Sequence, residues 1–176
     1  IMRIFISLKS RVCRTGQPAR SAAASALAET RKRNALVTWL IALAFALTAL
    51  QGHACTFNVT GVNFGSYDVF SNSALDSTGN IDVNCPNGVG YSMALTAGGG
   101  NYTQRVMSSG VHRLNYNLYT AANRAVVWGD AISGTVTVNG TGIGVNVNHG
   151  VYGRIPALQY VYPGSYSDII IVELTF

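Results

Sequence analysis

The side chains that could carry out chemistry are few and scattered in this sequence. Beyond Ala54 there are two histidines, His112 and His149, and there is no Gly-x-Ser-x-Gly motif that would present a serine nucleophile. No group of histidines, cysteines and acids has the spacing of a metal site. We interpret both histidines as structural surface or turn residues, and we expect no enzyme activity, no metal and no cofactor.

Two glycine-rich stretches could suggest phosphate binding. One is Gly98-Gly99-Gly100, and the other is the series Gly140, Gly142 and Gly144. Neither is followed by the helix start and the lysine that a phosphate-binding loop requires. We therefore interpret both stretches as hairpin and loop glycines.

The charge is unevenly distributed along the chain. The formal net charge is +5, but eight of the twelve basic residues lie in residues 1–54, where Glu29 is the single acid. The remainder has four arginines against six acids. A basic chain often binds nucleic acid, but here the basic residues lie in a leader, so we expect no nucleic-acid partner.

The basic leader has the layout of a secretory signal peptide. Arg31-Lys32-Arg33 precedes an apolar run over residues 35–50, and Gly52 and Ala54 stand where a signal peptidase prefers small residues. The run is shorter than the roughly 20 residues that a membrane-spanning helix needs. We predict cleavage after Ala54, export of the protein, and one domain over residues 55–176. A retained membrane anchor is the alternative.

Residues 1–30 are expected to lie outside the folded domain. The chain starts with Ile1, which we interpret as a wrongly assigned start codon, and signal peptides seldom have so long a basic leader. No repeating apolar face is predicted in this segment.

The part beyond Ala54 is predicted to be all-β. It contains no lysine and one glutamate, and it is rich in Gly, Val, Ile, Thr and Tyr. Strands are predicted at residues 56–62, 80–85, 91–96, 113–120 and 158–161. Short strands separated by turns favour a sandwich over a barrel.

Some positions inside this pattern have specific predictions. Ser71–Gly79 is turn-forming throughout, and Asn139-Gly140 is the strongest hairpin signal, flanked by strands over 135–138 and 143–147. Trp128 is expected in the core or in a lid over it. The phases of Tyr91 and Tyr116 place both in the core.

The C-terminal residues show the clearest alternation. Ile170, Val172, Leu174 and Phe176 are separated by Ile171, Glu173 and Thr175, which predicts a strand with one buried face. No later segment can pair with its free edge, and such an edge invites pairing by another chain. We hypothesise that accepting such a strand is the function.

Two cysteines remain once the leader with Cys13 is removed. An exported domain with a single cysteine pair usually has one disulfide. Cys85 is in phase with Ile81 and Val83, so it can point inward to meet Cys55. We therefore predict a disulfide between Cys55 and Cys85.

Taken together, these features resemble the spore coat protein U domain family, which includes the archaic chaperone-usher pilins. The resemblance covers the whole of residues 55–176. The matching stretches are Cys55, Val62–Tyr67, Gly79-x-Ile81-x-Val83-x-Cys85, Tyr91-x-x-x-Leu95, Arg105–Met107, Leu114-x-Tyr116-x-Leu118-Tyr119, Trp128–Asp130, Tyr152–Pro156 and Gly164-x-Tyr166-x-Asp168.

The resemblance implies an immunoglobulin-like β-sandwich that lacks its last strand. A periplasmic chaperone would hold it, an outer-membrane usher would export it, and a strand from a neighbouring pilus subunit would complete it. By the same resemblance, Cys55 and Cys85 form the disulfide, and Ile170, Val172, Leu174 and Phe176 border the groove for the donated strand. The protein would pass through the periplasm to the cell surface or pilus.

One departure from the family affects the expected role. Pilus-shaft members have an alternating donor segment between the cleavage site and the first cysteine, whereas here Cys55 directly follows Ala54. The expectation is therefore a tip or minor subunit. The alternative is a secreted surface adhesin that binds a ligand through exposed tyrosines and the loop over residues 98–101.

Overall fold

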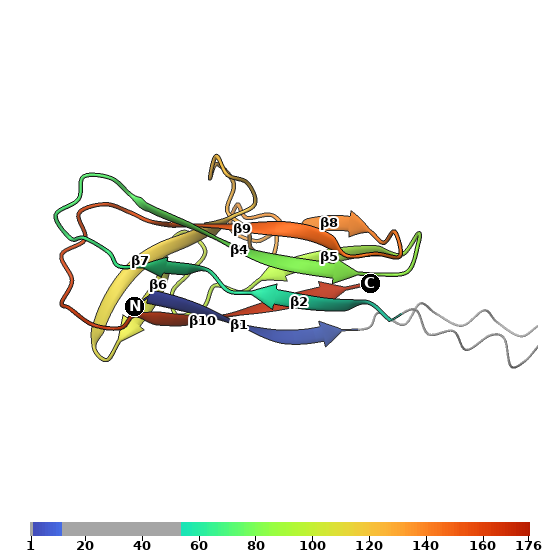
Figure 1. Ribbon diagram of the computed structural model, residues 1–176, viewed down its shortest axis with the longest axis horizontal. Coiled ribbons are helices and arrows are strands. Elements are labelled where there is room, and N and C mark those ends of the chain that lie inside the picture. Colours follow the sequence, from blue (N-terminus) through green and yellow to red (C-terminus); the bar gives the residue numbers. More distant parts are fainter. Residues whose placement is uncertain (1, 12–53) are drawn as a thin grey trace, which may run out of the picture. The chain divides into compact units, whose positions relative to one another are not determined.

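The computed structural model describes residues 2–11 and 54–176 (Figure 1). Every helix or strand assigned in this part is a β-strand, which confirms the all-β prediction. The strands are β1 Met2–Arg11, β2 Thr56–Thr60, β3 Asn63–Gly65, β4 Leu75–Asn84, β5 Gly90–Leu95, β6 Arg105–Ser109, β7 His112–Tyr119, β8 Val138–Thr141, β9 Val147–Ile155 and β10 Ser167–Thr175.

The strands form one sheet that curls over a core. Antiparallel pairing runs from β2 through β4 and β9 to β7. β7 also pairs with β6, and β10 pairs with β5 and, at a single position, with β6. β8 extends the far side of β5, while β1 and β3 extend the far side of β10.

Side-chain contacts between strands that are not paired through their backbones show that the two halves of the sheet face each other. The ring of Tyr91 on β5 meets that of His149 on β9 with centroids 5.8 Å apart, and Phe64 on β3 meets Tyr116 on β7 at 6.3 Å. The space between is filled by buried apolar residues from most strands. Trp128 is 1% exposed, so of its two predicted positions, the core and a lid, the core is the observed one, and the predicted burial of Tyr91 and Tyr116 is confirmed.

Ser71–Gly79 was predicted to be a turn, and that prediction is wrong for its second half. β4 begins at Leu75 and pairs with β9 from Leu75–Ile155 to Val83–Val147. Small polar residues are compatible with a strand when a long partner satisfies their backbone groups. Pairing with β9 therefore overrides the local turn preference.

The predicted Asn139-Gly140 hairpin is also wrong. Both residues lie inside β8, which pairs with β5 so that Gly140 stands opposite Tyr91. A Cβ atom at Gly140 would collide with the Tyr91 ring, so this glycine makes room for an aromatic side chain. No strand forms over residues 158–161, where Leu158 has a φ of +57°.

The predicted disulfide is present between Cys55 and Cys85. β2 and β4 are antiparallel neighbours, and Thr56 pairs with Asn84, so the two cysteines meet at the end of this pair. The predicted signal segment over residues 35–50 lies outside the described residues. Among the described residues, none belongs to a helix long and apolar enough to cross a membrane.

The edge of the terminal strand as candidate functional site

The terminal strand β10 has one buried and one exposed face, as its alternation predicts. Ile170, Val172 and Leu174 are fully buried, and Phe176 is partly buried against the same core. On the other face, Ile169 is 60% exposed and Thr175 is exposed, while Ile171 and Glu173 are half-buried. The residues expected to border a groove are therefore those that β10 contributes to the core.

The two edges of β10 have different partners. On one edge, β5 pairs antiparallel with residues 172–175, and the Thr96 amide and hydroxyl bond Ile171 backbone atoms at 3.0 Å. On the other edge, β1 runs parallel to β10 from Arg3–Ser167 to Arg11–Thr175. We call this second side the β10 edge. No strand from residues 54–176 lies against it, although β3 pairs with the outer side of β1.

Side chains near the start of β1 enter the core. Met2 is 6% and Ile4 is 3% exposed, whereas Arg3 points to solvent. The Arg3 amide donates to the Tyr166 carbonyl at 3.2 Å, and the Ile4 amide donates to the Val62 carbonyl at 3.0 Å. The strand is thus fixed by backbone bonds on both sides.

Gly61 leaves room for this backbone. It lies between β2 and β3, and a Cβ atom there would collide with the carbonyl oxygen of Ile4. Because this clash is with backbone, no side-chain rotation would relieve it. Glycine is therefore the residue that lets a strand pass at this position.

The expectation that residues 1–30 contribute nothing to the fold is wrong for residues 2–11. The same finding corrects the expectation that no segment pairs with the free edge of the terminal strand. In the sequence, Met2, Ile4, Ile6 and Leu8 alternate with Arg3, Phe5, Ser7 and Lys9. This is the two-residue period of a half-buried strand, and the basic residues obscured it.

A buried arginine holds together the loops on the β5 side of β10. Arg105 is fully buried, and its guanidinium donates to the carbonyls of Thr96 (2.9 Å) and Trp128 (2.7 Å) and to Asn117 Oδ1 (2.6 Å). Tyr102 lies over the guanidinium, 5.5 Å from ring centroid to Cζ. Burial lowers the pKa of Arg105, yet guanidinium groups remain charged in proteins. The positive charge is therefore kept inside the protein by neutral acceptors.

A buried carboxylate fixes the start of β10. Asp168 is 8% exposed, and it accepts from the Tyr116 hydroxyl at 2.6 Å and from the Gly99 amide at 3.0 Å. Burial, together with the bond to Asp168, raises the pKa of Tyr116 well above its usual value. Gly98 has a φ of +64°, and a Cβ there would collide with the carboxylate. The loop over residues 98–100 thus binds the Asp168 side chain through the Gly99 amide, although the three glycines are exposed.

Sequence reasoning missed this polar group, although a signal was present. Asp168 is in phase with Ile170 and Val172, and Arg105 is in phase with Met107, so both alternations place a charge on the buried face. Asn117 gave no such signal, because it lies between Tyr116 and Leu118 and all three are buried.

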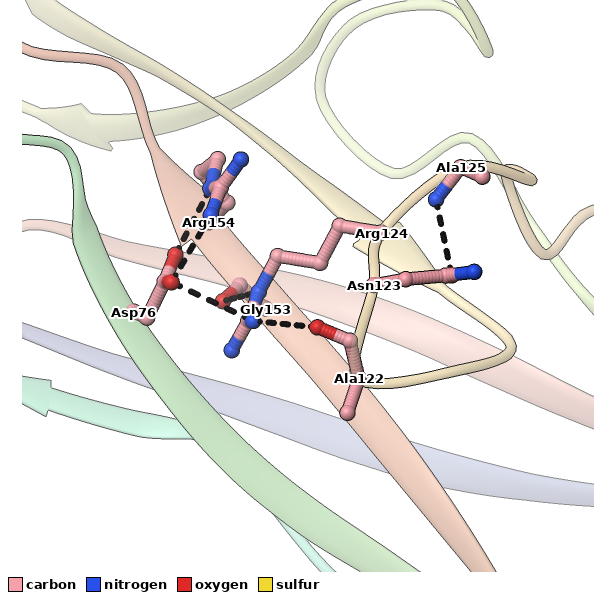
Figure 2. A network of polar contacts seen from close by, with 7 residues as sticks. All are labelled: Asp76, Ala122, Asn123, Arg124, Ala125, Gly153 and Arg154. Atoms are coloured by element: carbon pink, nitrogen blue, oxygen red, sulfur yellow. Dashed lines mark hydrogen bonds and ion pairs between the residues drawn. The ribbon is translucent and has the colours of Figure 1, made fainter.

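A second polar cluster lies on the opposite side of the sandwich, where β4 pairs with β9 (Figure 2). Asp76 binds Arg154 through both carboxylate oxygens, at 2.7 and 2.9 Å, and lies 3.2 Å from Arg124 Nη1. Arg124 also donates to the carbonyls of Gly153 and Ala122. The hydrogen bond from Arg154, followed by the charges of both arginines, holds the pKa of Asp76 below its ordinary value. The cluster ties the loop after β7 to β4 and β9.

The two histidines have structural contacts. His149 Nε2 lies 2.8 Å from the Tyr91 hydroxyl, and burial lowers the pKa of His149. The ring of His112 stacks on that of Tyr162, with centroids 4.5 Å apart. Neither lies beside a nucleophile in these contacts. Among residues 2–11 and 54–176, no three histidines, cysteines or acids are grouped to hold a metal ion.

Exposed aromatic residues gather near the start of β10. Phe70, Tyr160 and Tyr162 are 78%, 79% and 69% exposed. A groove of about 420 Å³ lies between the loops that follow β3 and β9, lined in part by Met2, Tyr67, Phe70, Tyr162 and Tyr166. Both loops lie at the end of the domain where β1 and β10 begin (Figure 1).

Comparison with known proteins gives consistent results. The family model of the Spore Coat Protein U domain matches residues 41–173. Protein U of Myxococcus xanthus is 31% identical over an alignment of 131 residues, and the match covers 65% of this chain and 71% of that protein.

Solved structures from pilus systems are also similar. One is the CsuC–CsuE chaperone–tip adhesion subunit pre-assembly complex of the archaic Csu pili of Acinetobacter baumannii, with 21% identity and a TM-score of 0.51. The match covers 70% of this chain and 39% of that chain, so this chain spans about two fifths of its length. Another is the E. coli Hda pilus minor tip subunit HdaB, with 15% identity, a TM-score of 0.40, and coverage of 68% of this chain and 79% of that chain. The first of these shows a shared fold.

Proposed function

Since the chain belongs to the spore coat protein U domain family, we propose that it is a non-enzymatic structural subunit of a chaperone-usher type pilus or surface appendage. Its working surface is the β10 edge, which accepts a strand from a partner chain. The domain is then an incomplete immunoglobulin-like sandwich over residues 55–176. The groove residues are Ile170, Val172, Leu174 and Phe176.

The observation that supports this proposal is the origin of the strand beside β10. Among the described residues, the strands β2 to β10 leave the β10 edge open. The strand that pairs there is β1, which precedes residues 12–53 in the sequence. A strand supplied from elsewhere fits this position by backbone pairing along the whole of β10. This is strand addition, a recurrent way in which proteins recognise extended segments.

The free energies involved indicate that folding of the domain depends on such a strand. About four alternate apolar side chains, at roughly 1.5–3 kcal/mol each, would contribute about 6–12 kcal/mol. A whole domain is stable by only about 5–15 kcal/mol. Residual burial in the unfolded chain lowers the first figure, but the two remain comparable. Whether the domain folds therefore depends on the strand at the β10 edge.

The partners follow from this function. A periplasmic chaperone would cover the edge in transit, an outer-membrane usher would export the subunit, and a neighbouring subunit would supply the final strand. With cleavage after Ala54, no residues remain ahead of Cys55 to donate to a neighbour. The protein would then act as a tip or minor subunit at the cell surface.

Periplasmic co-expression with a chaperone of the archaic pilus class tests this proposal. We expect a complex that withstands high salt, because its contacts are backbone pairing and apolar burial. The matched control is a chaperone with aspartates in place of the apolar residues of its own edge strand. Equal recovery with both chaperones would contradict strand addition.

A second candidate function, a secreted surface adhesin, is favoured by the aromatic groove. Phe70 and Tyr162 are largely exposed and line a groove of small-ligand size. Binding of glycans or hydrophobic beads by the folded protein is the test. Saturable binding that falls at least tenfold in a Phe70→Ser, Tyr162→Ser variant, with no assembly partner present, would favour the adhesin.

A further inference from the structure

We infer that the outer edge of β8 is a contact between two copies of this chain, whose β8 strands pair antiparallel across a two-fold axis at Gly140. We call the side of Val138–Thr141 that faces away from β5 the β8 edge. The contact involves only residues beyond Ala54, so it does not depend on the fate of the leader. It also leaves the β10 edge open, because β5 lies between β8 and β10.

Backbone groups at the β8 edge are available for pairing. The Gly142 amide donates to the Val89 carbonyl at 2.7 Å, so the backbone of Gly142 faces β5. Bonded positions alternate along an antiparallel pair, so Gly140 also bonds toward β5, whereas the backbone groups of Asn139 and Thr141 face the β8 edge. Among residues 2–11 and 54–176, no strand pairs with β8 on that side. Asn139 and Thr141 thus offer two donors and two acceptors.

A second β8 strand fits these groups. When two antiparallel copies are centred on Gly140, Asn139 of each copy stands opposite Thr141 of the other, and each such pair exchanges two backbone hydrogen bonds. Gly140 then meets its own copy at the close position, where Cα atoms are about 4.5 Å apart. Asn139 and Thr141 are exposed, so a second strand can approach them. The same surface serves both molecules, as a two-fold contact requires.

The apolar residues beside β8 also match in this arrangement. Val136 precedes β8 and Ile143 follows it, and their side chains are 38% and 60% exposed. Antiparallel pairing brings the end of one strand beside the start of its copy, so Val136 of each molecule comes near Ile143 of the other. Exposed apolar surface is then removed from water on both sides of the axis.

The absence of charge favours a second copy as the partner. No Lys, Arg, Asp or Glu occurs in residues 83–104, which contain β5, or in residues 131–153, which contain β8. Charges on edge strands commonly prevent pairing, and in a two-fold contact a charge at the edge would lie near its own copy. A strongly charged partner would find no complementary charge here. The edge strand β2 differs, because its Asn58 stands opposite Asp82 of β4.

The size of the contact determines how it would act. Four backbone bonds and a small apolar area are typical of weak, transient interfaces. On a surface that displays many copies, such contacts act together and become much stronger. The β8 edge would therefore join neighbouring appendages side by side. This lateral role rests on the proposed function, whereas the contact between two copies does not.

Cysteine cross-linking in the full chain, expressed with its leader, tests the register. One chain has Asn139→Cys and a second, differently tagged chain has Thr141→Cys, both in a Cys13→Ser background. These positions are direct partners across the axis, with Cα atoms about 5.5 Å apart, which a disulfide can span. In either chain alone, the two identical positions are displaced by two residues, roughly 6.6 Å along the strand, and exceed the roughly 7 Å limit for a disulfide.

We expect at least tenfold more covalent dimer from the mixture than from either chain alone, at about 0.5 mM because the contact is small. Each chain by itself is the matched control for random collision. Equal yields from the mixture and the single chains would overturn the inference.

Charge at the β8 edge gives a second readout without cysteines. Asn139→Lys places two like charges beside the axis, so the associated fraction in sedimentation should fall at least fivefold. Asn58→Lys is the control, because Asn58 is also exposed on an edge strand and should leave association unchanged. A mixture of Asn139→Lys and Thr141→Asp chains should restore association, because the introduced charges are opposite in sign and face each other across the axis.

The outcomes separate this inference from the proposed function. Association that Asn139→Lys leaves unchanged would place the contact elsewhere, and a parent chain that stays monomeric would exclude it, so either result overturns the inference. Binding to hydrophobic beads that Ile143→Ser abolishes, without self-association, would also overturn it. Association through the β8 edge, together with equal recovery of the two chaperones in the periplasmic test, would refute the proposed function alone.

Discussion

The β4–β9 side of the sandwich and the β10 edge are completed in different ways. On the β4–β9 side, β2, β4, β9 and β7 pair antiparallel with one another, and a disulfide and the Asp76 cluster join them further. At the β10 edge, the partner strand runs parallel and comes from residues 2–11. Antiparallel strands can be joined by short turns, whereas a parallel pair needs a long crossover. The strand at the β10 edge is therefore the one most easily supplied by another molecule.

The largest effect of a single substitution is expected for Arg105→Ala, beside β10. Loss of the guanidinium leaves the carbonyls of Thr96 and Trp128 and the Asn117 side chain without their donor, and it creates a cavity. We expect a loss of about 3–5 kcal/mol in the free energy of unfolding, measured by denaturant titration. Arg113→Ala is the control, because Arg113 is exposed on the adjacent strand. Similar losses for both would show that the buried network is not specific.

The disulfide tests the β4–β9 side. It closes a loop between residues 30 apart in sequence, and removing it by Cys55→Ala, Cys85→Ala should cost about 3.5 kcal/mol in the chain-entropy account. In a Cys13→Ser background, a disulfide between Arg3→Cys on β1 and its direct partner Ser167→Cys on β10 should still form in the folded fraction, since the β10 edge is unchanged. Loss of that cross-link in folded protein would contradict the independence of the two regions.

Tyr116→Phe tests the start of β10. It removes the hydroxyl that donates to the buried Asp168, so we expect a loss of about 1.5–3 kcal/mol and faster exchange of the Gly99 amide. Tyr160→Phe is the control, because Tyr160 is 79% exposed. A change below about 0.5 kcal/mol for Tyr116→Phe would mean that water replaces the hydroxyl.

The smallest effect concerns Asp76, on the β4–β9 side. Its pKa is lowered in the folded state, so its contribution is full above the unfolded pKa and is lost as pH falls through the folded value. Because the side chain is 36% exposed, Asp76→Asn should cost less than about 1 kcal/mol at pH 7. The variant and the parent chain should converge in stability as the pH falls through the lowered folded-state pKa of Asp76. A gap that stays constant throughout the acid range would exclude the ion pairs as the cause.

The sequence was informative where the alternation of apolar residues coincided with burial. The terminal strand, the core tyrosines and the Cys55–Cys85 disulfide follow from the period of two and from the number of cysteines. The strand and the tyrosines depend on residues close in sequence, and the disulfide depends on there being only one possible cysteine pair beyond Ala54. They could be predicted because no distant contact competes with them.

The failures have a common physical origin in contacts between distant residues. Asn139-Gly140 has the residues of a tight turn, but the glycine instead accommodates the Tyr91 ring. β4 extends into turn-forming residues because β9 is long enough to pair with them. Residues 2–11 have a strand period, but their partner β10 lies at the other end of the chain. Local propensity cannot reveal such partners.

The central claim is that the domain over residues 55–176 needs a strand at the β10 edge. A denaturant melt of that domain, with and without a peptide of residues 2–11, tests the claim most directly, and a peptide with Ile4→Asp is the control. We predict no cooperative transition, or a stability well below about 5 kcal/mol, for the domain alone, and a marked gain with the peptide but not with the control. A cooperative melt with a stability of about 5 kcal/mol or more and no gain from the peptide would contradict the claim.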